Sequence, residues 1–318
     1  MEDLQMGHEV ENMMYVTGAE RFVPWHGLGV AVNDCVNSEE ALKIAGLDWD
    51  VIPQPIYTEA RYKIPGYIAN TRSSDNSVLG IVSDKYKIVQ NKEAFAFTDA
   101  LLDMEAKYVT AGSLRGGKNI WLLANLPSHK ILGDEVAQYL CFTNTHDGSG
   151  AVKVCMSPVR VVCSNTLNLA LSKAKRIWTC RHMGKLEDKL HEATRTLELS
   201  NKYMEELNVA AERLANTSLT NDQLMAIVAE MFPINEDGSH RQLANMEKAK
   251  KEFMIAYYMP DIAQFRNTAW GMINAISDWC GHSSPQRTSA TYQERNFERI
   301  INGHPMLDEI VKKCGVQI

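Results

Sequence analysis

The chain has 318 residues and a formal net charge of −6, with 45% hydrophobic and 23% charged residues. This composition is typical of a soluble globular protein with one large or two modest domains, and no apolar run approaches the roughly 20 residues of a membrane-spanning helix. The acidic segment from Met1 to Asn12 lacks the apolar core of a signal peptide. The seven cysteines are scattered without a CxxC pair, which argues against a zinc ribbon or a disulfide framework and indicates reduced thiols in a cytoplasm.

The first half is predicted to be rich in strands. Alternating apolar residues and polar turns predict strands over 67–70, 77–83 and 85–90, followed by a helix over 91–104 with Asn91 as its cap. Two hairpins are expected next, one pairing 107–114 with 119–126 around a Gly-Gly turn, and one pairing 138–144 with 151–156 around the glycine-rich loop 146–150. Pro158 is then expected to start a helix over 159–174.

The second half is predicted to be helical. Apolar residues recur at helical spacing over 186–216, 221–232, 243–258, 262–280 and 288–301, and polar capping residues precede several of these segments. The fold class expected is therefore α+β, with an antiparallel hairpin sheet and packed helices in the N-terminal half. We expect one domain over 1–185, which contains a basic strand–helix segment, and a helical region over 186–318 packed on it.

The segment from Gly148 to Lys185 carries only positive charge, although the whole chain is acidic. A basic surface on an acidic protein indicates a site for polyanions, so this segment is predicted to bind nucleic acid. Ser and Asn side chains beside it, and cations at a hairpin tip, would add phosphate contacts. The residues expected to bind are Arg115, Lys118, Lys153, Arg160, Ser164, Asn168, Lys173, Lys175, Arg176, Arg181 and Lys185. The alternative is a solvated helix face that happens to be basic.

Catalytic and metal sites are weakly indicated. Residues 112–119 approach a phosphate-binding loop, but an apolar strand follows them where a helix N-terminus is needed. His146 and Asp147, with Cys180 and His182 further along, form the densest His cluster, and its spacing matches no known metal or catalytic motif. We therefore expect no metal and no cofactor, and an enzymatic function is the less favoured interpretation.

Three separated segments resemble one family. They are Trp25-His26-Gly27-Leu28-Gly29, Arg160-Val161-Val162-Cys163-Ser164-Asn165-Thr166-Leu167-Asn168 and Trp270-Gly271-Met272-Ile273-Asn274-Ala275. In this order they are similar to the phage/plasmid-like family called domain of unknown function 932, and the similarity runs from about Gly7 to His304. The resemblance implies a protein encoded by a phage, plasmid or prophage island, in the cytoplasm of a bacterial host. It implies no established activity.

A second resemblance rests on the order of elements alone. A helix, two hairpins and a basic helix in succession are similar to the core of single-strand annealing proteins of the Rad52 and Red-beta type. In those proteins a sheet and its following helix line a positively charged groove for single-stranded DNA. This resemblance is an analogy of topology, without a motif match.

Three functions remain open. The first is a non-enzymatic protein that binds or anneals single-stranded nucleic acid, DNA more than RNA, in recombination or replication, and for which a homo-oligomeric state is also open. The second is a phage protein that modulates a host or phage complex through the acidic helical half, and the third is an enzyme with an unrecognised site. The acidic residues expected to make the contact in the second case are Glu187, Asp188, Glu192, Glu198, Glu205, Glu206 and Glu212.

Overall fold

The computed structural model covers the whole chain and describes residues 10–16, 30–32, 37–102, 107–160, 165–171, 175–180, 187–234, 238–282 and 302–318. The chain forms two compact units. Unit 1 comprises Met1–Pro127, Tyr139–Met156 and Arg176–Leu199, and unit 2 comprises Ser128–Gln138, Ser157–Lys175 and Ser200–Ile318. Each unit combines segments that are far apart in the sequence; the expected division at residue 185 stays a prediction.

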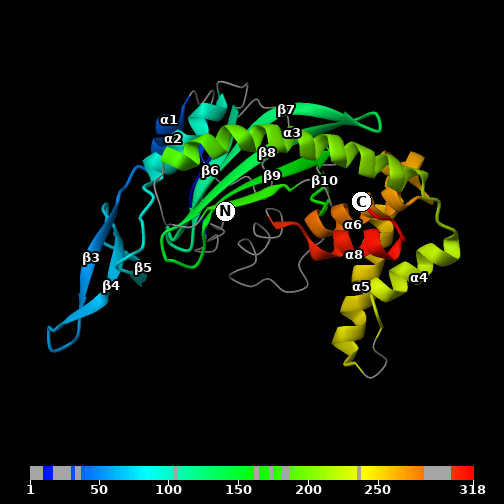
Figure 1. The fold of residues 1–318 in the computed structure, drawn as a ribbon. Coiled ribbons are helices and arrows are strands. Elements are labelled where there is room, and N and C mark those ends of the chain that lie inside the picture. Colours follow the sequence, from blue (N-terminus) through cyan, green and yellow to red (C-terminus); the bar gives the residue numbers. More distant parts are fainter. Residues whose placement is uncertain are drawn as a thin grey trace. The chain divides into compact units, whose positions relative to one another are not determined.

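A sheet of eight strands is the largest element of the fold (Figure 1). Its strands run in the order β10-β9-β8-β7-β6-β1-β2, and β11 pairs with β9 beside β10. The strands of this sheet are β1 (Val10–Val16), β2 (Val30–Val32), β6 (Lys107–Leu114), β7 (Asn119–Ile131), β8 (Asp134–Thr145), β9 (Val152–Arg160), β10 (Asn165–Thr166) and β11 (Ile177–Cys180).

The central strands β6, β7 and β8 are buried on both faces over much of their length, with consecutive buried residues rather than an alternation. Trp121 and Tyr108 are among the largest fully buried side chains. Runs of apolar residues such as Ile120-Trp121-Leu122-Leu123 are typical of strands that are covered on both faces. The hydrophobic core of unit 1 therefore lies around these strands.

A second sheet of unit 1 has three strands in the order β3-β4-β5 and extends away from the large sheet as an arm (Figure 1). The strands are β3 (Val51–Tyr57), β4 (Lys63–Arg72) and β5 (Val78–Ser83), and we call residues 51–83 the arm. Both pairings are antiparallel. Helices α1 (Ser38–Ile44) and α2 (Asn91–Leu102) flank the arm in the sequence and contact each other.

Unit 2 is mainly helical. Capping boxes define two helix starts, since the Thr220 side chain accepts from the Gln223 N–H and the Ser239 side chain accepts from the Gln242 N–H. The helices of this half are α3 (Glu187–Asn216), which begins in unit 1, α4 (Asn221–Met231), α5 (His240–Tyr257), the 3₁₀ helix η1 (Pro260–Phe265), α6 (Ala269–His282) and α8 (Pro305–Lys313). None of the described helices combines the length and the apolar composition that crossing a bilayer requires.

The α+β class expected from the sequence is confirmed. The two predicted hairpins form around the Gly-Gly turn and around the 146–150 loop, and the helices predicted over 91–104, 186–216, 221–232 and 243–258 form within a few residues of the expected bounds. The division into an α+β N-terminal half and a helical C-terminal half holds only in part, because unit 2 combines the C-terminal helices with Ser128–Gln138 of the sheet region, and unit 1 includes the start of α3. The helix predicted over 288–301 lies outside the described residues.

Two smaller predictions are wrong. The segment 85–90 forms no strand. A side chain, and not a ladder of backbone hydrogen bonds, holds its end: the Gln90 amide accepts from the Val51 N–H and donates to the Val51 carbonyl. The single helix expected over 262–280 is broken between η1 and α6. There Asn267 has a φ of 60°, and the Thr268 side chain accepts from the Gly271 N–H as a local cap.

The prediction of a basic helix over 159–174 is also wrong. Of its described residues, Val159 and Arg160 continue β9, Asn165 and Thr166 form β10, and residues 167–171 have no regular structure. Pro158 fits in the strand because of the hydrogen bonds of Leu167, which lies opposite it. The Leu167 N–H donates to the Pro158 carbonyl, and the Leu167 carbonyl accepts from the Leu169 N–H instead of from residue 158. The N–H that proline lacks is therefore not required at this position, and the β-branched residues around it favour the strand.

Candidate interaction surface on the arm

Two of the residues predicted to bind nucleic acid are held by the fold, and a third is half-buried. Arg176 is buried, and its guanidinium donates to the Met156 carbonyl at 3.4 Å. Asn168 is also buried and exchanges hydrogen bonds with the Ser157 hydroxyl. Lys153 lies in β9 and is half-buried. Arg176 and Asn168 are therefore bonded within the fold and are not exposed on a surface that a ligand could reach.

The remaining residues of the basic segment are brought together only in part. Lys175 is exposed, and the backbone of Arg160 pairs with Asn165 in β10. The other predicted contacts lie outside the described residues: Ser164, Lys173, Arg181 and Lys185. Their role in binding stays a prediction. The continuous basic helix face that would have aligned them is not present over the described residues of 159–174.

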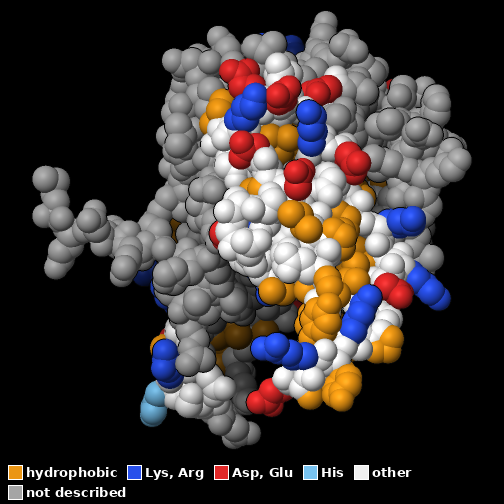
Figure 2. All heavy atoms as spheres, turned by 90° about the vertical axis from the view of Figure 1, so that its left-hand side faces the viewer, with side chains coloured by type: hydrophobic (Ala, Val, Ile, Leu, Met, Phe, Trp, Pro, Cys, Tyr) orange, Lys and Arg blue, Asp and Glu red, His pale blue; other side chains and the backbone are white. Residues whose placement is uncertain are grey.

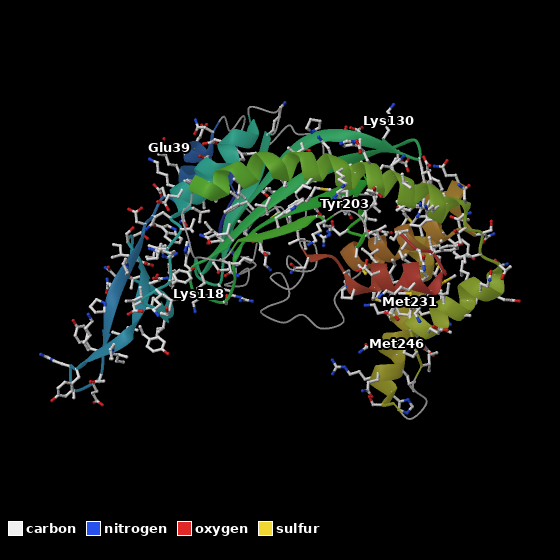
Figure 3. The ribbon with its side chains drawn as sticks, in the orientation of Figure 1. Glu39, Lys118, Lys130, Tyr203, Met231 and Met246 are labelled. Atoms are coloured by element: carbon white, nitrogen blue, oxygen red, sulfur yellow. The ribbon has the colours of Figure 1, made fainter. Side chains whose placement is uncertain are left out.

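Arg115 and Lys118 lie in the β6–β7 turn, as the sequence indicates. Arg115 is exposed and adopts a φ of 54°, and two glycines with positive φ follow it. The Lys118 carbonyl accepts from the His146 N–H at 2.7 Å, which ties this turn to the β8–β9 loop. Figure 3 shows Lys118 at the end of the large sheet that lies toward the arm.

A buried polar network around His146 holds the base of the arm. His146 is fully buried, with its Nε2 2.9 Å from Asn91 Oδ1 and its ring edge-on to Trp49. The Asn91 amide donates to the Leu47 carbonyl, and the amide of Asn70, on the arm, donates to the His146 carbonyl at 2.8 Å. Because such groups are costly to bury without partners, this network fixes the β8–β9 loop against β4.

The hydrogen bonds of His146 and Asp147 give these two members of the predicted His cluster structural roles. Asp147 accepts from the Ser149 N–H and hydroxyl, as in a local turn, and His182 lies outside the described residues. Within the described part of the chain, no three His, Cys, Asp or Glu side chains are grouped as a metal site would require. The thiols of Cys141 and Cys155 are free but buried, and burial raises the pKa of Cys155 to about 12, which disfavours the reactive thiolate.

The tip of the arm presents tyrosines and cations to solvent. Tyr62 is 75% exposed and Tyr57 is 55% exposed, and both flank the turn in which Arg61 has a φ of 62°. Two bonds close this turn, from the Arg61 N–H to the Thr58 carbonyl and from the Thr58 N–H to the Tyr62 carbonyl. Lys63 lies opposite Tyr57 in the ladder, and Arg61 and Lys63 are exposed without an ion pair to another described residue.

The two faces of the arm sheet are covered to different extents. On one face Asn70 and Val82 are buried while Pro53 and Pro55 are exposed, and on the other face only Thr71 is buried. Residues directly opposite each other in a ladder share a face, as do alternate residues along a strand. The inner face contacts the 146–148 loop and contains Pro53, Pro55, Ile68, Asn70, Gly80 and Val82. The outer face contains Ile52, Gln54, Tyr67, Ala69, Thr71, Val78, Ile81 and Ser83.

Large apolar side chains gather on the outer face. Ile52, Tyr67, Val78 and Ile81 are between 42% and 62% exposed. A bulge at Leu79, where the register shifts between Asn70 and Thr71, places both Val78 and Ile81 on this face although they are three residues apart. Figure 2, which looks at the molecule from the arm side, shows a band of hydrophobic side chains with charged side chains of both signs beside it.

The inner face is in close contact with the rest of unit 1. A Cβ built on Gly80 would lie 2.3 Å from Asp147 Cα, so only glycine fits there. A Cβ on Gly148, which has a φ of 77°, would lie 3.0 Å from Val82 Cγ1. The arm is therefore seated through backbone contacts at its base, while its tip and outer face remain open.

The sequence of this chain matches one protein family over most of its length. Residues 78–301 match the family described as "Domain of unknown function (DUF932)". The chain belongs to that family. The match begins at the first residue of β5 and includes the large antiparallel hairpins and most of the helices. Strands β3 and β4 of the arm precede it, so the tyrosine-bearing tip lies outside the matched residues.

No curated protein and no solved structure matches the chain. The similarity in element order to single-strand annealing proteins is not shown, and its last element, the basic helix, is replaced by β9 and β10 in the described residues. The DUF932 resemblance drawn from three motifs is confirmed by this match, which contains the second and third of them. The first motif, Trp25–Gly29, precedes the match and lies outside the described residues. The third motif is Trp270–Ala275. Its residues Trp270, Met272, Ile273 and Asn274 are buried, so this motif belongs to the core of unit 2.

The arm was not recognised as a site from the sequence. One available signal was the spacing of Tyr57, Tyr62 and Tyr67 around the basic residues Arg61 and Lys63. Another was the pair of prolines, Pro53 and Pro55, in an otherwise apolar segment. Tyrosine is as common in protein cores as on binding surfaces, so the sequence did not separate the two cases.

Proposed function

We propose that this DUF932 protein is a non-enzymatic protein that binds single-stranded nucleic acid, DNA in preference to RNA, through the tip of the arm. The observation that carries this proposal is the exposure of Tyr57 and Tyr62 beside Arg61 and Lys63. Proteins that bind single strands without reading their sequence combine aromatic rings, on which bases stack, with cations that neutralise phosphates. Both chemistries lie within one short turn.

The proposal relocates the main contact from the basic segment 148–185 to the arm. Arg115 and Lys118 are the secondary contacts in this proposal, because their turn adjoins the base of the arm: a Cβ on Gly117 would lie 3.1 Å from Arg72 Nη1. Lys175 is exposed and suited to a phosphate contact as well. Buried Arg176 and Asn168 are expected to affect stability instead.

Fluorescence anisotropy with labelled single-stranded DNA, at low and at moderate salt, tests the proposal. We expect Tyr62→Ser and Lys63→Gln each to weaken binding by about tenfold, because one stacked base is worth roughly 1–3 kcal/mol, and Lys63→Gln to reduce the salt dependence by about one ion. Matched controls are Tyr258→Ser, a 58% exposed tyrosine next to Arg266 in unit 2, and Lys312→Gln. These controls should bind as the parent does.

Two results would overturn the proposal. One is the absence of binding at low salt. The other is binding that survives the tip variants but is lost in Arg181→Gln and Lys185→Gln, which would return the site to the basic segment.

A second candidate function is supported by the apolar outer face of the arm. Ile52, Val78 and Ile81 are aliphatic and offer no charge to a phosphate backbone, so this face suits a protein partner. This candidate places the contact on the arm instead of on the acidic helix α3, of which Glu205 and Glu212 are exposed.

A further inference from the structure

We infer that the outer face of the arm is an interface with a second copy of this chain. The inference goes beyond nucleic-acid binding and does not depend on it, because the outer face and the tip use different residues. An antiparallel sheet that faces water normally alternates apolar and polar residues, with the polar ones outside. Here the outward positions of β5 are Val78 and Ile81, and those of β3 and β4 include Ile52 and Tyr67.

The charge of the face restricts its partner. All eight outer-face residues are uncharged, namely Ile52, Gln54, Tyr67, Ala69, Thr71, Val78, Ile81 and Ser83. A polyanion requires cations, and a charged peptide requires opposite charges, so neither matches this surface. A copy of the same face is uncharged, equally apolar and equally twisted, and an isologous contact between two copies carries no charge repulsion.

The β3 edge of the arm is closed to strand pairing, so association on this side of the arm must use the outer face. The Asp50 carbonyl accepts a hydrogen bond from the Ser73 N–H. The backbone N–H and C=O groups of residues 50, 52 and 54 therefore point toward β4, and those of residues 51, 53 and 55 point toward the free edge of β3. The backbone groups of Val51 are bonded to the Gln90 side chain, and Pro53 and Pro55 have no N–H to offer. Prolines at such positions block edge-to-edge association.

The area of the face sets the expected strength of the contact. The four large side chains are about half exposed, and a fully exposed side chain of this size offers roughly 150–200 Å², so two copies would bury ~700 Å² from these residues alone. The neighbouring small side chains and backbone bring the total toward ~1,000 Å², at the lower end of specific interfaces. We therefore expect a reversible dimer that forms at micromolar concentrations.

Sedimentation velocity on the full chain, across a hundredfold range of concentration and without nucleic acid, tests this inference. The parent should shift from monomer to dimer with concentration. Ile81→Lys should remain monomeric, because an isologous contact would bring the two introduced charges into one apolar interface. Ile255→Lys is the matched control, since Ile255 is 55% exposed on α5, and it should dimerise as the parent does.

A milder variant distinguishes loss of the dimer from loss of the fold. Ile81→Thr keeps a β-branched side chain suited to a strand, and it should weaken the dimer by about tenfold while the thermal unfolding profile stays unchanged. A parent that is monomeric at every concentration overturns the inference, even if it binds another protein or DNA through the arm. So does a dimer that persists in Ile81→Lys and Val78→Lys. Loss of DNA binding in Tyr62→Ser with the dimer intact would leave this inference standing.

Discussion

The two faces of the arm are built from the same three strands, yet they are covered to different extents. On the inner face, Gly80 and Asn70 contact the 146–148 loop through backbone contact and a buried amide. On the outer face, Val78 and Ile81 remain more than half exposed. Because the strands and their hydrogen bonds are shared, the difference between the faces comes from what packs on each of them. The inner face should therefore control stability, and the outer face should control association.

The largest effect is expected from Gly80→Ala. The added Cβ would meet the Asp147 backbone at 2.3 Å, and backbone cannot move aside as a flexible side chain does. We expect a loss of about 3 kcal/mol in the free energy of unfolding, measured by urea denaturation. Gly66→Ala is the control. Gly66 has a φ of 78° but nothing within 4 Å of its built Cβ, so only the backbone strain of about 1 kcal/mol should appear. Equal losses in the two variants would contradict close seating of the inner face.

His146→Ala should have the next largest effect. The change removes a fully buried ring, its bond to Asn91 and its contact with Trp49. A cavity and an unsatisfied Asn91 amide oxygen together should cost about 3 kcal/mol, seen as a lower melting temperature. A variant that melts like the parent would show that this network does not hold the arm.

Leu79 and Ile81 provide the direct comparison of buried and exposed positions on one strand. Leu79 is fully buried at the bulge and Ile81 is 62% exposed. Leu79→Ala should cost about 2–4 kcal/mol, whereas Ile81→Ala should change the free energy of unfolding of the monomer by about 0.5 kcal/mol or less. The measurement is thermal denaturation at a concentration below dimerisation. Similar losses at both positions would mean that the outer face is covered within the monomer.

The smallest effect concerns the β4–β5 turn. Hydrogen bonds from the Ser77 N–H, the Arg72 side chain and the Ser77 hydroxyl lower the pKa of Asp75 from 3.8 to about 2. Since the folded pKa is the lower one, the stabilisation is complete above about pH 4 and is lost as the pH falls toward 2. An NMR titration of the Asp75 carboxyl should give this midpoint. Asp75→Asn should remove the pH dependence of nearby amide shifts, and a midpoint near 4 in the parent would contradict the bonding seen here.

Local sequence patterns predicted much of the secondary structure. The Gly116-Gly117 turn, the 146–150 loop and the capping residues Thr220 and Ser239 each act through their own neighbours, and the hairpins and helices that they predict are present. The segment 159–174 was mispredicted for the opposite reason. Its helical spacing was compatible with a helix, but β9 gains a partner strand on each side, and the Leu167 bond compensates for Pro158.

The sequence indicated which chemistry a nucleic-acid site would use, but it did not indicate the arm as the candidate site. Arg176 and Asn168 have side chains suited to phosphates, and only packing shows that they bond Met156 and Ser157 instead. The tyrosines of the arm have no local property that marks them as exposed. Their exposure becomes visible only in the folded arm, whose base contacts the large sheet through Gly80 and Asp147, residues that are 67 positions apart in the sequence.

The sequence by itself determined the α+β class, the family and the positions of most turns and helices, because these depend on local propensity and on motifs that can be read along the chain. Only the tertiary structure decided which face of the arm is covered, which basic residues are buried and which tyrosines meet solvent. Solvent exposure is a property of what packs on a residue, and the groups that pack here, such as His146 on Asn91 and Asp147 on Gly80, come from distant segments.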